Sequence, residues 1–395
     1  MVKKKNTILV LSEVFPPTIG GSGNWLHEIY KRQPTEKTVL LVGDHPDAAE
    51  FDSKSELNVV RTNMITPKWS VMKLSGTIIF FKMLREIIRL GRTHKLSEIH
   101  CGRPMPEGVV GLVASKILRT GLVVFIHGED IEISRRSREH RFFTQLVLAR
   151  ADRLVCNCKH SRSLLVDAWR CKDANVRVLF PRTDTALFTP VADRNSAKEG
   201  LGWNGRKVLL TVSRLDYRKG HDKLIEALPR IIVDVPKVLY VIAGGGLDAA
   251  YGKQLQQQVH DLGLNNHVVF TGACEIDMLV RYYQCCDLFV LPNRQIGGNL
   301  EGFGIVLLEA QACGRPVIAG DSGGTVETML PGESGLIVDC TEAENLVAPV
   351  VDLIKDTDRL EKMGKRGRQS MVENFSWSTL GSGAAASVFL EKSPT

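Results

Sequence analysis

Several features that would indicate other classes of protein are missing from this sequence. It has no apolar run long enough to cross a membrane. Its amino end, Lys3-Lys4-Lys5 followed by the strand-like TILVLS, lacks the longer apolar segment and the cleavage site of a secretory signal. The nine cysteines lack the two-pair spacing of a zinc site, and their odd number favours reduced thiols. We therefore expect a cytoplasmic protein without a structural zinc ion.

Signatures of nucleic-acid binding are also missing. The sequence has neither zinc-finger spacing nor an aromatic-rich RNA-binding signature. Its formal net charge is nevertheless +7, which suits a polyanionic partner. We therefore expect phosphorylated small molecules or an anionic membrane surface as partners, and no nucleic acid.

What the sequence does contain is an alternation of short β-branched runs with longer helical patterns. The runs TILVLS, TVLLVG, LVVFIHG and RLVCN alternate with helical patterns at 70–90, 108–118 and 139–150. The alternation resumes with KVLLTVS, KVLYVIAGGG, HVVFTG, DLFVLP and PVIAG. Strands separated by helices predict parallel sheets with right-handed crossovers, and 395 residues suit two domains. The predicted fold class is therefore α/β, with two doubly wound parallel-sheet domains.

The join between the two domains is expected near 180–200, where the chain is polar and lacks periodicity. We assign residues 1–185 to an N-terminal domain and 186–376 to a C-terminal domain. The final segment predicts a helix at 377–392 that crosses back onto the first domain. Two such domains that face each other would form a cleft. Because ligands bind beyond the carboxyl ends of parallel strands, polar residues that follow strands are the candidate functional residues.

Two candidate stretches follow strands of the first domain. FPPTIGGSGNW, 15–25, carries Gly20 and Gly21 before a helix start that favours anions, but it has neither dinucleotide-fingerprint nor P-loop spacing. An ordinary glycine-rich turn explains it equally well. FIHGED, 125–130, places His127 at a strand end, where it is either functional or a structural histidine. Glu129 and Asp130 either orient a hydroxyl-rich ligand or cap the next helix.

Two further stretches follow strands of the second domain. In SRLDYRKG, 213–220, Arg214 and Lys219 precede a helix start and suit a diphosphate, although a solvated loop is the alternative. In EGFGIVLLEA, Glu301 precedes a glycine-rich turn, and a helix starting near Gly304 offers N–H groups to a phosphate. Glu309 lies further along that helix, where it can accept two hydrogen bonds from a vicinal diol such as a ribose.

Together these stretches resemble family 4 of the retaining glycosyltransferases, which have the GT-B fold. The shared features are two glutamates eight positions apart, the downstream ACGRPVIAGDSGGTVETM, and the segments FPPTIGG, HGED and SRLDYRKG. The resemblance spans nearly the whole chain. EGFGIVLLEAQACGRPVIAGDSGG is most similar to the branch of phosphatidylinositol-mannoside mannosyltransferases and bacterial envelope glycan transferases. One departure is FPRTD, where Arg182 stands at a position that is glycine in many relatives.

The resemblance implies a role for each candidate residue. Gly20 and Gly21 would adjoin the donor diphosphate and the reacting sugar, and His127 would contact that sugar. The catalytic set it implies is His127, Arg214, Lys219 and Glu301. The donor-binding set it implies is Gly20, Gly21, Arg214, Lys219, Glu301, Gly302, Phe303, Gly304, Ile305 and Glu309. The acceptor candidates are Glu129 and Asp130.

The resemblance implies transfer of a hexose from a nucleoside-diphosphate sugar to a hydroxyl, with retention of the anomeric configuration. GDP-mannose is favoured and a UDP-hexose stays open. The acceptor would be a glycan or a lipid-linked molecule of envelope or polysaccharide biosynthesis. No carboxylate cluster resembles a metal-binding Asp pair, so neither a metal nor another cofactor is expected. A nucleotide-sugar epimerase and a non-catalytic binding subunit remain alternatives.

A basic, amphipathic stretch at 68–95 predicts a membrane-docking helix in the first domain. Its cations are Lys68, Lys73, Lys82, Arg85, Arg89, Arg92 and Lys95. Its apolar residues are Trp69, Ile78, Ile79, Phe80, Phe81 and Leu84. The expected location is therefore the cytoplasm, with peripheral docking on the inner face of the membrane. Alternatively, the apolar side belongs to the core and the cations form its solvated face.

Overall fold

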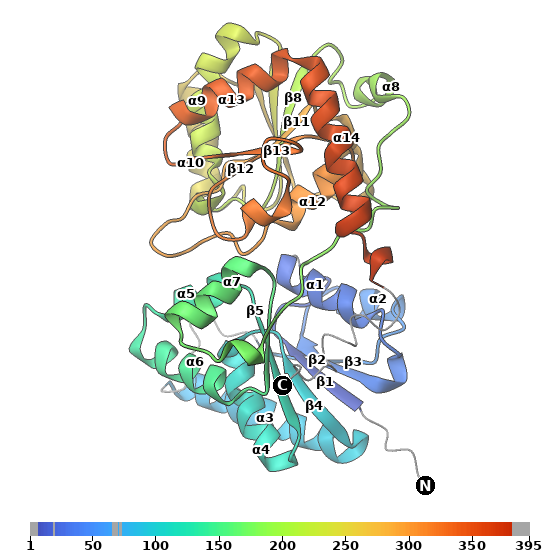
Figure 1. Cartoon of the computed structure of the whole chain (residues 1–395), viewed down its shortest axis with the longest axis vertical. Helices are drawn as coiled ribbons and strands as arrows, with labels where there is room; N and C mark the ends of the chain where they lie inside the picture. The colour runs from blue at the N-terminus through green and yellow to red at the C-terminus, as the bar shows by residue number, and fades with distance from the viewer. Residues whose placement is uncertain (1–6, 19, 65–69, 71–72, 381–395) are drawn as a thin grey trace. The chain divides into compact units, whose positions relative to one another are not determined.

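The computed structural model of the chain describes residues 7–18, 20–64, 70 and 73–380 (Figure 1). The chain divides into two compact units, one up to Phe180 and the other Pro181–Thr379. The second unit ends within the helix expected at 377–392. The first three residues of that segment form a short 3₁₀ helix, Trp377–Thr379, and residues 381–392 lie outside the described part.

The first unit contains a parallel sheet in the order β3-β2-β1-β4-β5-β6-β7. Its strands are β1 Thr7–Ser12, β2 Thr38–Gly43, β3 Val59–Thr62, β4 Leu96–Cys101, β5 Gly121–Ile126, β6 Arg153–Cys156 and β7 Val176–Val178. Its α-helices are α1 Gly21–Tyr30, α2 Ala48–Ser53, α3 Leu74–His94, α4 Val109–Leu118, α5 Glu129–Ser134, α6 Arg138–Arg150 and α7 Lys159–Ser163.

The second unit contains a parallel sheet in the order β10-β9-β8-β11-β12-β13. Its strands are β8 Lys207–Val212, β9 Val238–Ala243, β10 Val268–Gly272, β11 Leu288–Leu291, β12 Val317–Gly320 and β13 Gly335–Val338. Its α-helices are α8 Arg194–Glu199, α9 His221–Asp234, α10 Ala250–Asp261, α11 Ile276–Cys285, α12 Ile305–Ala312, α13 Glu344–Lys355 and α14 Thr357–Asn374. The prediction of two doubly wound parallel-sheet domains is confirmed.

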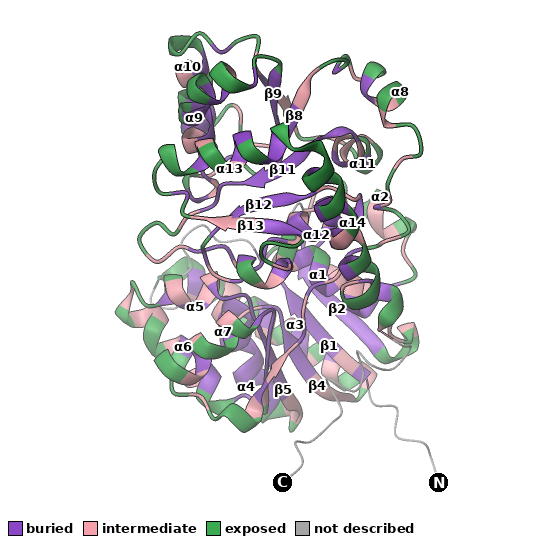
Figure 2. Cartoon of the chain, turned by 45° about the horizontal axis from the view of Figure 1, so that its top comes forward, coloured by how far each residue is buried: buried purple, intermediate pink, exposed green. Residues whose placement is uncertain are grey.

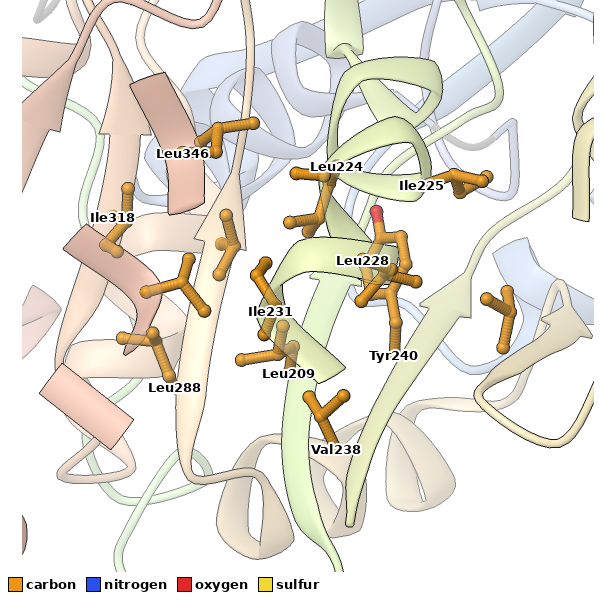
Figure 3. Close-up of a cluster of buried hydrophobic side chains, with 14 of the residues drawn as sticks. Leu209, Leu224, Ile225, Leu228, Ile231, Val238, Tyr240, Leu288, Ile318 and Leu346 are labelled. Atoms are coloured by element: carbon orange, nitrogen blue, oxygen red, sulfur yellow. The ribbon is translucent and has the colours of Figure 1, made fainter. Parts of the chain in front are cut away.

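The inner strands of each sheet are largely buried, whereas the edge strands β3, β7, β10 and β13 are mostly of intermediate burial. The helices present an exposed outer face (Figure 2). In the second unit, Leu224, Leu228 and Ile231 of α9 pack towards the strand residues Leu209 and Tyr240 (Figure 3). Burial of one such leucine or isoleucine side chain contributes about 1.5–3 kcal/mol. This core therefore fixes α9 and the β8–α9 connection, which carries part of the candidate site.

Each sheet reverses its strand order at one central pair, β1/β4 in the first unit and β8/β11 in the second. The connections that leave the two strands of such a pair turn to opposite faces of the sheet and open a crevice at the carboxyl edge. Three of the four motifs singled out in the sequence follow strands of these pairs, whereas FIHGED follows β5. FPPTIGGSGNW follows β1, SRLDYRKG follows β8, and the stretch with Glu301 and Glu309 follows β11.

The segment with Arg182 is well ordered by contacts within the second unit. Arg182 Nη1 donates hydrogen bonds to the carbonyls of Asn374 and Ser376 and to Thr379 Oγ1, at 2.8, 3.1 and 2.7 Å. Thr183 pairs with Ser376 as a parallel bridge. Arg182, which stands where many relatives have glycine, therefore links the 181–185 segment by hydrogen bonds to the end of α14 and the segment that follows it.

Part of the expected membrane-facing surface of α3 belongs to the core instead. Ile79, Phe80 and Leu84 pack against the buried cluster of the first unit. By contrast, Leu74, Ile78 and Phe81 are 78%, 58% and 60% exposed. Lys68 and Trp69 lie outside the described residues.

Candidate functional site

The connection from β8 to α9 is shaped by a glycine that no other residue could replace without strain. Gly220 has φ +75°, and a Cβ there would lie 1.8 Å from the carbonyl oxygen of Pro292. Just before it, Asp216 accepts a hydrogen bond from the Arg218 N–H at 3.0 Å and caps a single 3₁₀ turn, Tyr217–Lys219. This turn carries Arg218 and Lys219 towards the end of β11.

Glu301 receives both of these cations on one of its carboxylate oxygens. Arg218 Nη1 donates to Glu301 Oε2 at 2.8 Å, and Lys219 Nζ donates to the same oxygen. Burial would raise the pKa of Glu301, which is 8% exposed, but the charges of Lys219 and Arg218 outweigh burial and lower it. Glu301 is therefore ionised at neutral pH. Its other oxygen, Oε1, has no hydrogen-bond partner among the described residues and can accept hydrogen bonds from a ligand.

The backbone of Glu301 is held by the loop after β12. Its N–H donates to Ser322 Oγ at 3.3 Å, and its carbonyl accepts from the Gly324 N–H at 3.1 Å. Gly323 has φ +64°, and a Cβ there would lie 1.9 Å from the Glu301 carbonyl oxygen. The DSGG sequence downstream of the two glutamates therefore acts as a backbone support for Glu301.

The turn after Glu301 delivers the chain into α12 (Figure 1). Gly304 has φ +90° and ψ +59° and is the residue before the helix, while Phe303 is buried. The N–H groups in the first turn of an α-helix lack partners within the helix and favour an anion. The amino end of α12, beginning with Ile305, is thus suited to a phosphate group, as the sequence predicts.

Glu309 is anchored in a similar way, by a tyrosine. Tyr283 of α11, which is fully buried, donates its hydroxyl hydrogen to Glu309 Oε2 at 2.7 Å. Burial raises the pKa of Glu309 to about 7, and the Tyr283 hydrogen bond opposes this rise. Oε1 of Glu309 has no partner among the residues that the structure describes. Each glutamate therefore uses one oxygen for the protein and leaves the other available.

Arg214 lies in the same connection as Lys219 but outside this ion-pair cluster. Its side chain is exposed and makes no hydrogen bond or ion pair within the described part of the chain. The connection itself is anchored on either side of it. Ser213 Oγ hydrogen-bonds to His221 Nε2 at 2.9 Å, and His221 Nδ1 hydrogen-bonds to the Tyr240 hydroxyl at 3.1 Å. Burial lowers the pKa of His221 to about 4, so this buried histidine is neutral.

In the first unit, His127 follows β5 and is held by contacts of its ring and of its backbone. Its Nε2 donates to the Gly102 carbonyl at 2.8 Å, and its ring meets Trp25 edge-on at a centroid distance of 5.5 Å. Its backbone carbonyl accepts from Asn157 Nδ2 at 3.2 Å. Burial lowers the pKa of His127, so the ring is neutral at pH 7. With Nε2–H donating to Gly102, Nδ1 is left as a hydrogen-bond acceptor.

Asp130 supports the turn that carries His127. Its carboxylate accepts hydrogen bonds from the His127 N–H at 3.2 Å and from the Ile131 N–H at 2.9 Å. These contacts directly support the capping alternative for Asp130. Glu129 is the first residue of α5. A ligand role for either carboxylate stays a prediction.

The glycine-rich stretch after β1 forms the start of α1. Gly20 is the residue before the helix and Gly21 is its first residue. A Cβ on Gly23 would lie 2.8 Å from the Val14 carbonyl oxygen, so this glycine lets the helix pack closely on the preceding loop. The loop and the helix start are thus held together, which supports a backbone-lined ligand site.

Neither a metal cluster nor a membrane-spanning helix is found in the described part of the chain. No group of three or more His, Cys, Asp or Glu side chains there is arranged to hold a metal ion. No helix among the described residues is both long enough and apolar enough to span a bilayer.

Sequence reasoning identified Lys219, Glu301 and Glu309, but it missed two residues that hold them. Arg218 stands next to Lys219 in a run of charges that reads as a solvated loop. Tyr283 precedes Glu309 by a long stretch of chain, and no local pattern links them. The one available signal was the tyrosine pair in YYQCCD near the end of an apolar helical pattern, because a buried tyrosine hydroxyl usually has a hydrogen-bond partner.

Comparisons with known proteins show which family the chain belongs to. The family described as Glycosyltransferase Family 4 matches residues 19–187, and Glycosyl transferases group 1 matches residues 193–370. The chain is 32% identical over 383 residues to the GDP-mannose-dependent alpha-(1-6)-phosphatidylinositol monomannoside mannosyltransferase of Mycolicibacterium smegmatis, covering 95% of this chain and 96% of that protein. A protein of the same name from Mycobacterium tuberculosis is 30% identical over 380 residues, covering 94% and 95%.

Solved structures show the same fold. HepE of Anabaena, in complex with UDP and glucose, superimposes with a TM-score of 0.82 at 23% identity, covering 98% of this chain and all of that one. WaaG, a glycosyltransferase involved in lipopolysaccharide biosynthesis, gives a TM-score of 0.71 at 16% identity, covering 97% and 99%. Both are GT-B glycosyltransferases, and the matches give no support to the epimerase alternative. The chain belongs to the family 4 glycosyltransferases and is a glycosyltransferase that uses a nucleotide sugar.

Proposed function

We propose that this enzyme transfers mannose from GDP-mannose, with retention of configuration, to a hydroxyl of a glycan or lipid-linked acceptor of envelope biosynthesis. The observation that carries the proposal is the pair of glutamates, each anchored through Oε2 with Oε1 available. The spacing from Glu301 to Glu309 along one turn and helix matches a ligand with hydroxyl groups at both ends and a phosphate between them. The preference for GDP-mannose is supported by the relatives at 30–32% identity, which are named as GDP-mannose-dependent mannosyltransferases.

The donor-binding roles follow from the charges and the available atoms. Glu309 Oε1 accepts hydrogen bonds from the ribose, and Glu301 Oε1 accepts them from the transferred sugar. Arg214 and Lys219 neutralise the diphosphate, since guanidinium and ammonium groups are suited to phosphate oxygens. The backbone of Gly302, Phe303, Gly304 and Ile305 meets the sugar and the phosphates at the amino end of α12.

The reaction breaks the bond between the sugar C1 and the diphosphate oxygen and forms a bond from C1 to the acceptor oxygen. The acceptor attacks from the same side as the leaving group, so no protein nucleophile is needed and the configuration is kept. The proton of the acceptor hydroxyl passes to the departing diphosphate. Negative charge develops on that diphosphate, and Arg214, Lys219 and the α12 N–H groups stabilise it. Loss of one such donor typically costs about 3 kcal/mol of barrier lowering.

The first unit contributes to the sugar end of the donor. His127 is neutral and presents Nδ1 as an acceptor for a sugar hydroxyl. Gly20 and Gly21 allow the backbone to approach the diphosphate and the reacting sugar. Asp130 acts through the turn that it caps, whereas Glu129 remains a candidate for direct contact with the acceptor.

No metal ion takes part in this scheme, because Arg214 and Lys219 supply the positive charge that a divalent cation provides in other phosphate chemistry.

We further propose that the enzyme works at the cytoplasmic face of a membrane and docks through α3. Leu74, Ile78 and Phe81 recur at a spacing of four and three residues and are exposed. Exposed cations lie on the same helix, namely Lys82, Arg85, Arg89 and Arg92. Each cation near an anionic surface contributes about 1 kcal/mol, so several can hold the enzyme reversibly.

Co-sedimentation with liposomes tests the docking proposal. The double variant Ile78→Ser/Phe81→Ser should pellet less than the wild type with anionic liposomes at low salt. Val233→Ser removes a side chain that is 82% exposed on α9 of the other unit, so it should pellet like the wild type. Negligible pelleting of the wild type in both anionic and neutral liposomes would reject docking.

A donor panel tests the proposed activity. Thermal shifts with GDP-mannose, GDP, UDP-glucose and UDP identify the nucleotide, since a ligand at 100 times its dissociation constant adds about 2.7 kcal/mol of stability. Transfer from the stabilising donor to phosphatidylinositol-mannoside acceptors is then followed by mass spectrometry. Stabilisation by UDP-glucose alone would overturn the assignment of GDP-mannose, and donor hydrolysis without transfer to any acceptor would overturn the transferase assignment for these acceptors.

A further inference from the structure

A second cluster of charged residues lies at the carboxyl edge of the first sheet, and none of its members belongs to the donor-binding set. Glu13 follows β1, and Arg103 and Glu107 follow β4. These two strands are the pair at which the strand order of the first sheet reverses. Ligands of doubly wound sheets bind in the crevice at that place.

Glu107 is a buried carboxyl group with only part of its hydrogen-bonding capacity used. It is 0% exposed, and its Oε1 accepts a hydrogen bond from the Glu13 N–H at 2.8 Å. Its Oε2 is buried and has no hydrogen-bond partner among the described residues. A buried polar atom without a partner is costly, typically about 1–3 kcal/mol, and calls for an explanation such as a ligand.

Arg103 lies beside these carboxylates without a hydrogen bond to any of them. Its Nε is 3.9 Å from Glu107 Oε1, and the guanidinium makes no hydrogen bond within the part of the chain described. Burial lowers the pKa of Arg103, but the charges of Glu107, Glu13, Asp130 and Glu129 outweigh burial and raise it. The side chain is 28% exposed. Its five N–H donors are therefore held in place by charge and remain available to a ligand.

We propose that Arg103, Glu13 and Glu107 form the subsite that recognises the hydroxyl groups of an uncharged polyol ring in the acceptor. The guanidinium donates to hydroxyl oxygens, while the carboxylates accept from the hydroxyl hydrogens. Burial raises the pKa of Glu13 and raises the pKa of Glu107 to about 7. Glu13, Glu107, Asp130 and Glu129 nevertheless outnumber the single guanidinium on which their charges act, so the local charge disfavours a phosphate or another anion. The assignment of this subsite to the acceptor rests on the proposed transferase function. Binding of a polyol can be measured without catalysis.

Saturation-transfer NMR on the full chain tests the subsite with three probes: myo-inositol, methyl α-mannopyranoside and myo-inositol 1-phosphate. At least one of the two neutral polyols should receive saturation from the wild type. Arg103→Met and Glu13→Gln should each raise the dissociation constant of that probe about tenfold or more, because a hydrogen bond to a charged group is lost. Glu13→Gln keeps the hydrogen bond from the backbone N–H of residue 13 to Glu107 Oε1, so the variant should fold like the wild type.

Arg150→Met is the matched control, since Arg150 is exposed at the carboxyl end of α6, before β6 begins. Its polyol binding should equal that of the wild type. In all variants the binding of GDP should be unchanged, which shows that the donor site in the second unit is intact.

Three results would overturn the inference. The first is an absence of saturation transfer to either neutral polyol. The second is equal polyol binding by Arg103→Met and Arg150→Met. The third is tighter binding of myo-inositol 1-phosphate than of myo-inositol, which would make this an anion site. A failure of the transferase proposal would appear separately, as an absence of transfer from every donor while polyol binding persists.

Discussion

Glu309→Gln should stabilise the ligand-free protein above pH 7 while weakening its hold on the nucleotide. Burial raises the pKa of Glu309 to about 7 from an ordinary value of 4.5. The folded state therefore binds this proton more tightly than the unfolded state does. Between pH 4.5 and pH 7 the folded state carries more protons than the unfolded state, so the free energy of unfolding falls as the pH rises. Above pH 7 the destabilisation by the ionised Glu309 is fully present.

The magnitude follows from that difference in pKa. At 1.36 kcal/mol per pH unit, ionisation of Glu309 costs the folded state about 3 kcal/mol at most. The side chain is only partly shielded from water, so a cost of about 1–2 kcal/mol is the realistic expectation. Glutamine has no charge to desolvate, and its carbonyl can still accept the hydrogen bond from Tyr283. The variant should therefore gain this free energy at pH 8 and little of it at pH 5.

Nucleotide binding should change in the opposite direction. A hydrogen bond from ribose to a charged acceptor contributes about 1.5–3 kcal/mol, so GDP should bind roughly 10- to 100-fold more weakly to Glu309→Gln at pH 8. In the wild type the affinity for GDP should rise between pH 5 and pH 8 as Glu309 loses its proton. Glu309→Gln should lack the part of this rise that comes from deprotonation of Glu309. The titration of GDP itself affects both proteins equally, so it cancels when their affinities are compared.

Urea unfolding at pH 5 and pH 8 and calorimetric titration with GDP measure both effects. Glu361→Gln, on α14 of the same unit, removes an exposed carboxylate and should leave stability and GDP affinity near the wild-type values. The reasoning is refuted if Glu309→Gln is less stable than the wild type at pH 8, or if it binds GDP as tightly.

Three further predictions concern the same unit. Arg214→Ala and Lys219→Ala should each lower kcat/KM by about two orders of magnitude with the circular dichroism spectrum unchanged, since each removes a stabilising charge; near-wild-type turnover in both would reject the diphosphate assignment. Glu301→Gln should slow transfer with little loss of GDP affinity, and should also lower stability because Arg218 is left buried without a full counter-charge; a variant that loses GDP affinity alone would mean that the two glutamates have exchanged roles. Activity should persist in excess EDTA, whereas loss that magnesium or manganese restores would show a metal requirement.

Most strands that are continuous apolar runs could be predicted from the sequence, although β13, with the sequence GLIV, was not among those predicted. The strand β4, Leu96–Cys101, was missed because its sequence LSEIHC is polar at alternate positions. The structure explains how these residues are accommodated. Glu98 pairs with Arg153, and His100 joins Glu98 at 2.9 Å and the Tyr30 hydroxyl at 2.6 Å. Partners distant in sequence make a polar strand stable, and no local pattern reveals them.

In the candidate site, too, local sequence reveals some residues and not others. Residues that sit at strand ends or beside glycines that a turn requires, such as Lys219 and Glu301, can be found from local sequence. Residues that hold them from another element cannot, and Tyr283 on α11 is the plainest example. Arg182, which stands where many relatives have glycine, is a further example. Its three hydrogen bonds reach Asn374, Ser376 and Thr379, which are distant in sequence.

The most direct test of the account is the anomeric configuration of the product. GDP-mannose carries α-linked mannose, and the one-bond coupling between C1 and H1 in the isolated product distinguishes an α from a β linkage by NMR. The account predicts that incubation with GDP-mannose and a phosphatidylinositol-mannoside acceptor yields an α-mannoside, because the acceptor attacks from the side that the diphosphate leaves. A β-mannoside would show inversion and would contradict the mechanism built on Arg214, Lys219 and Glu301.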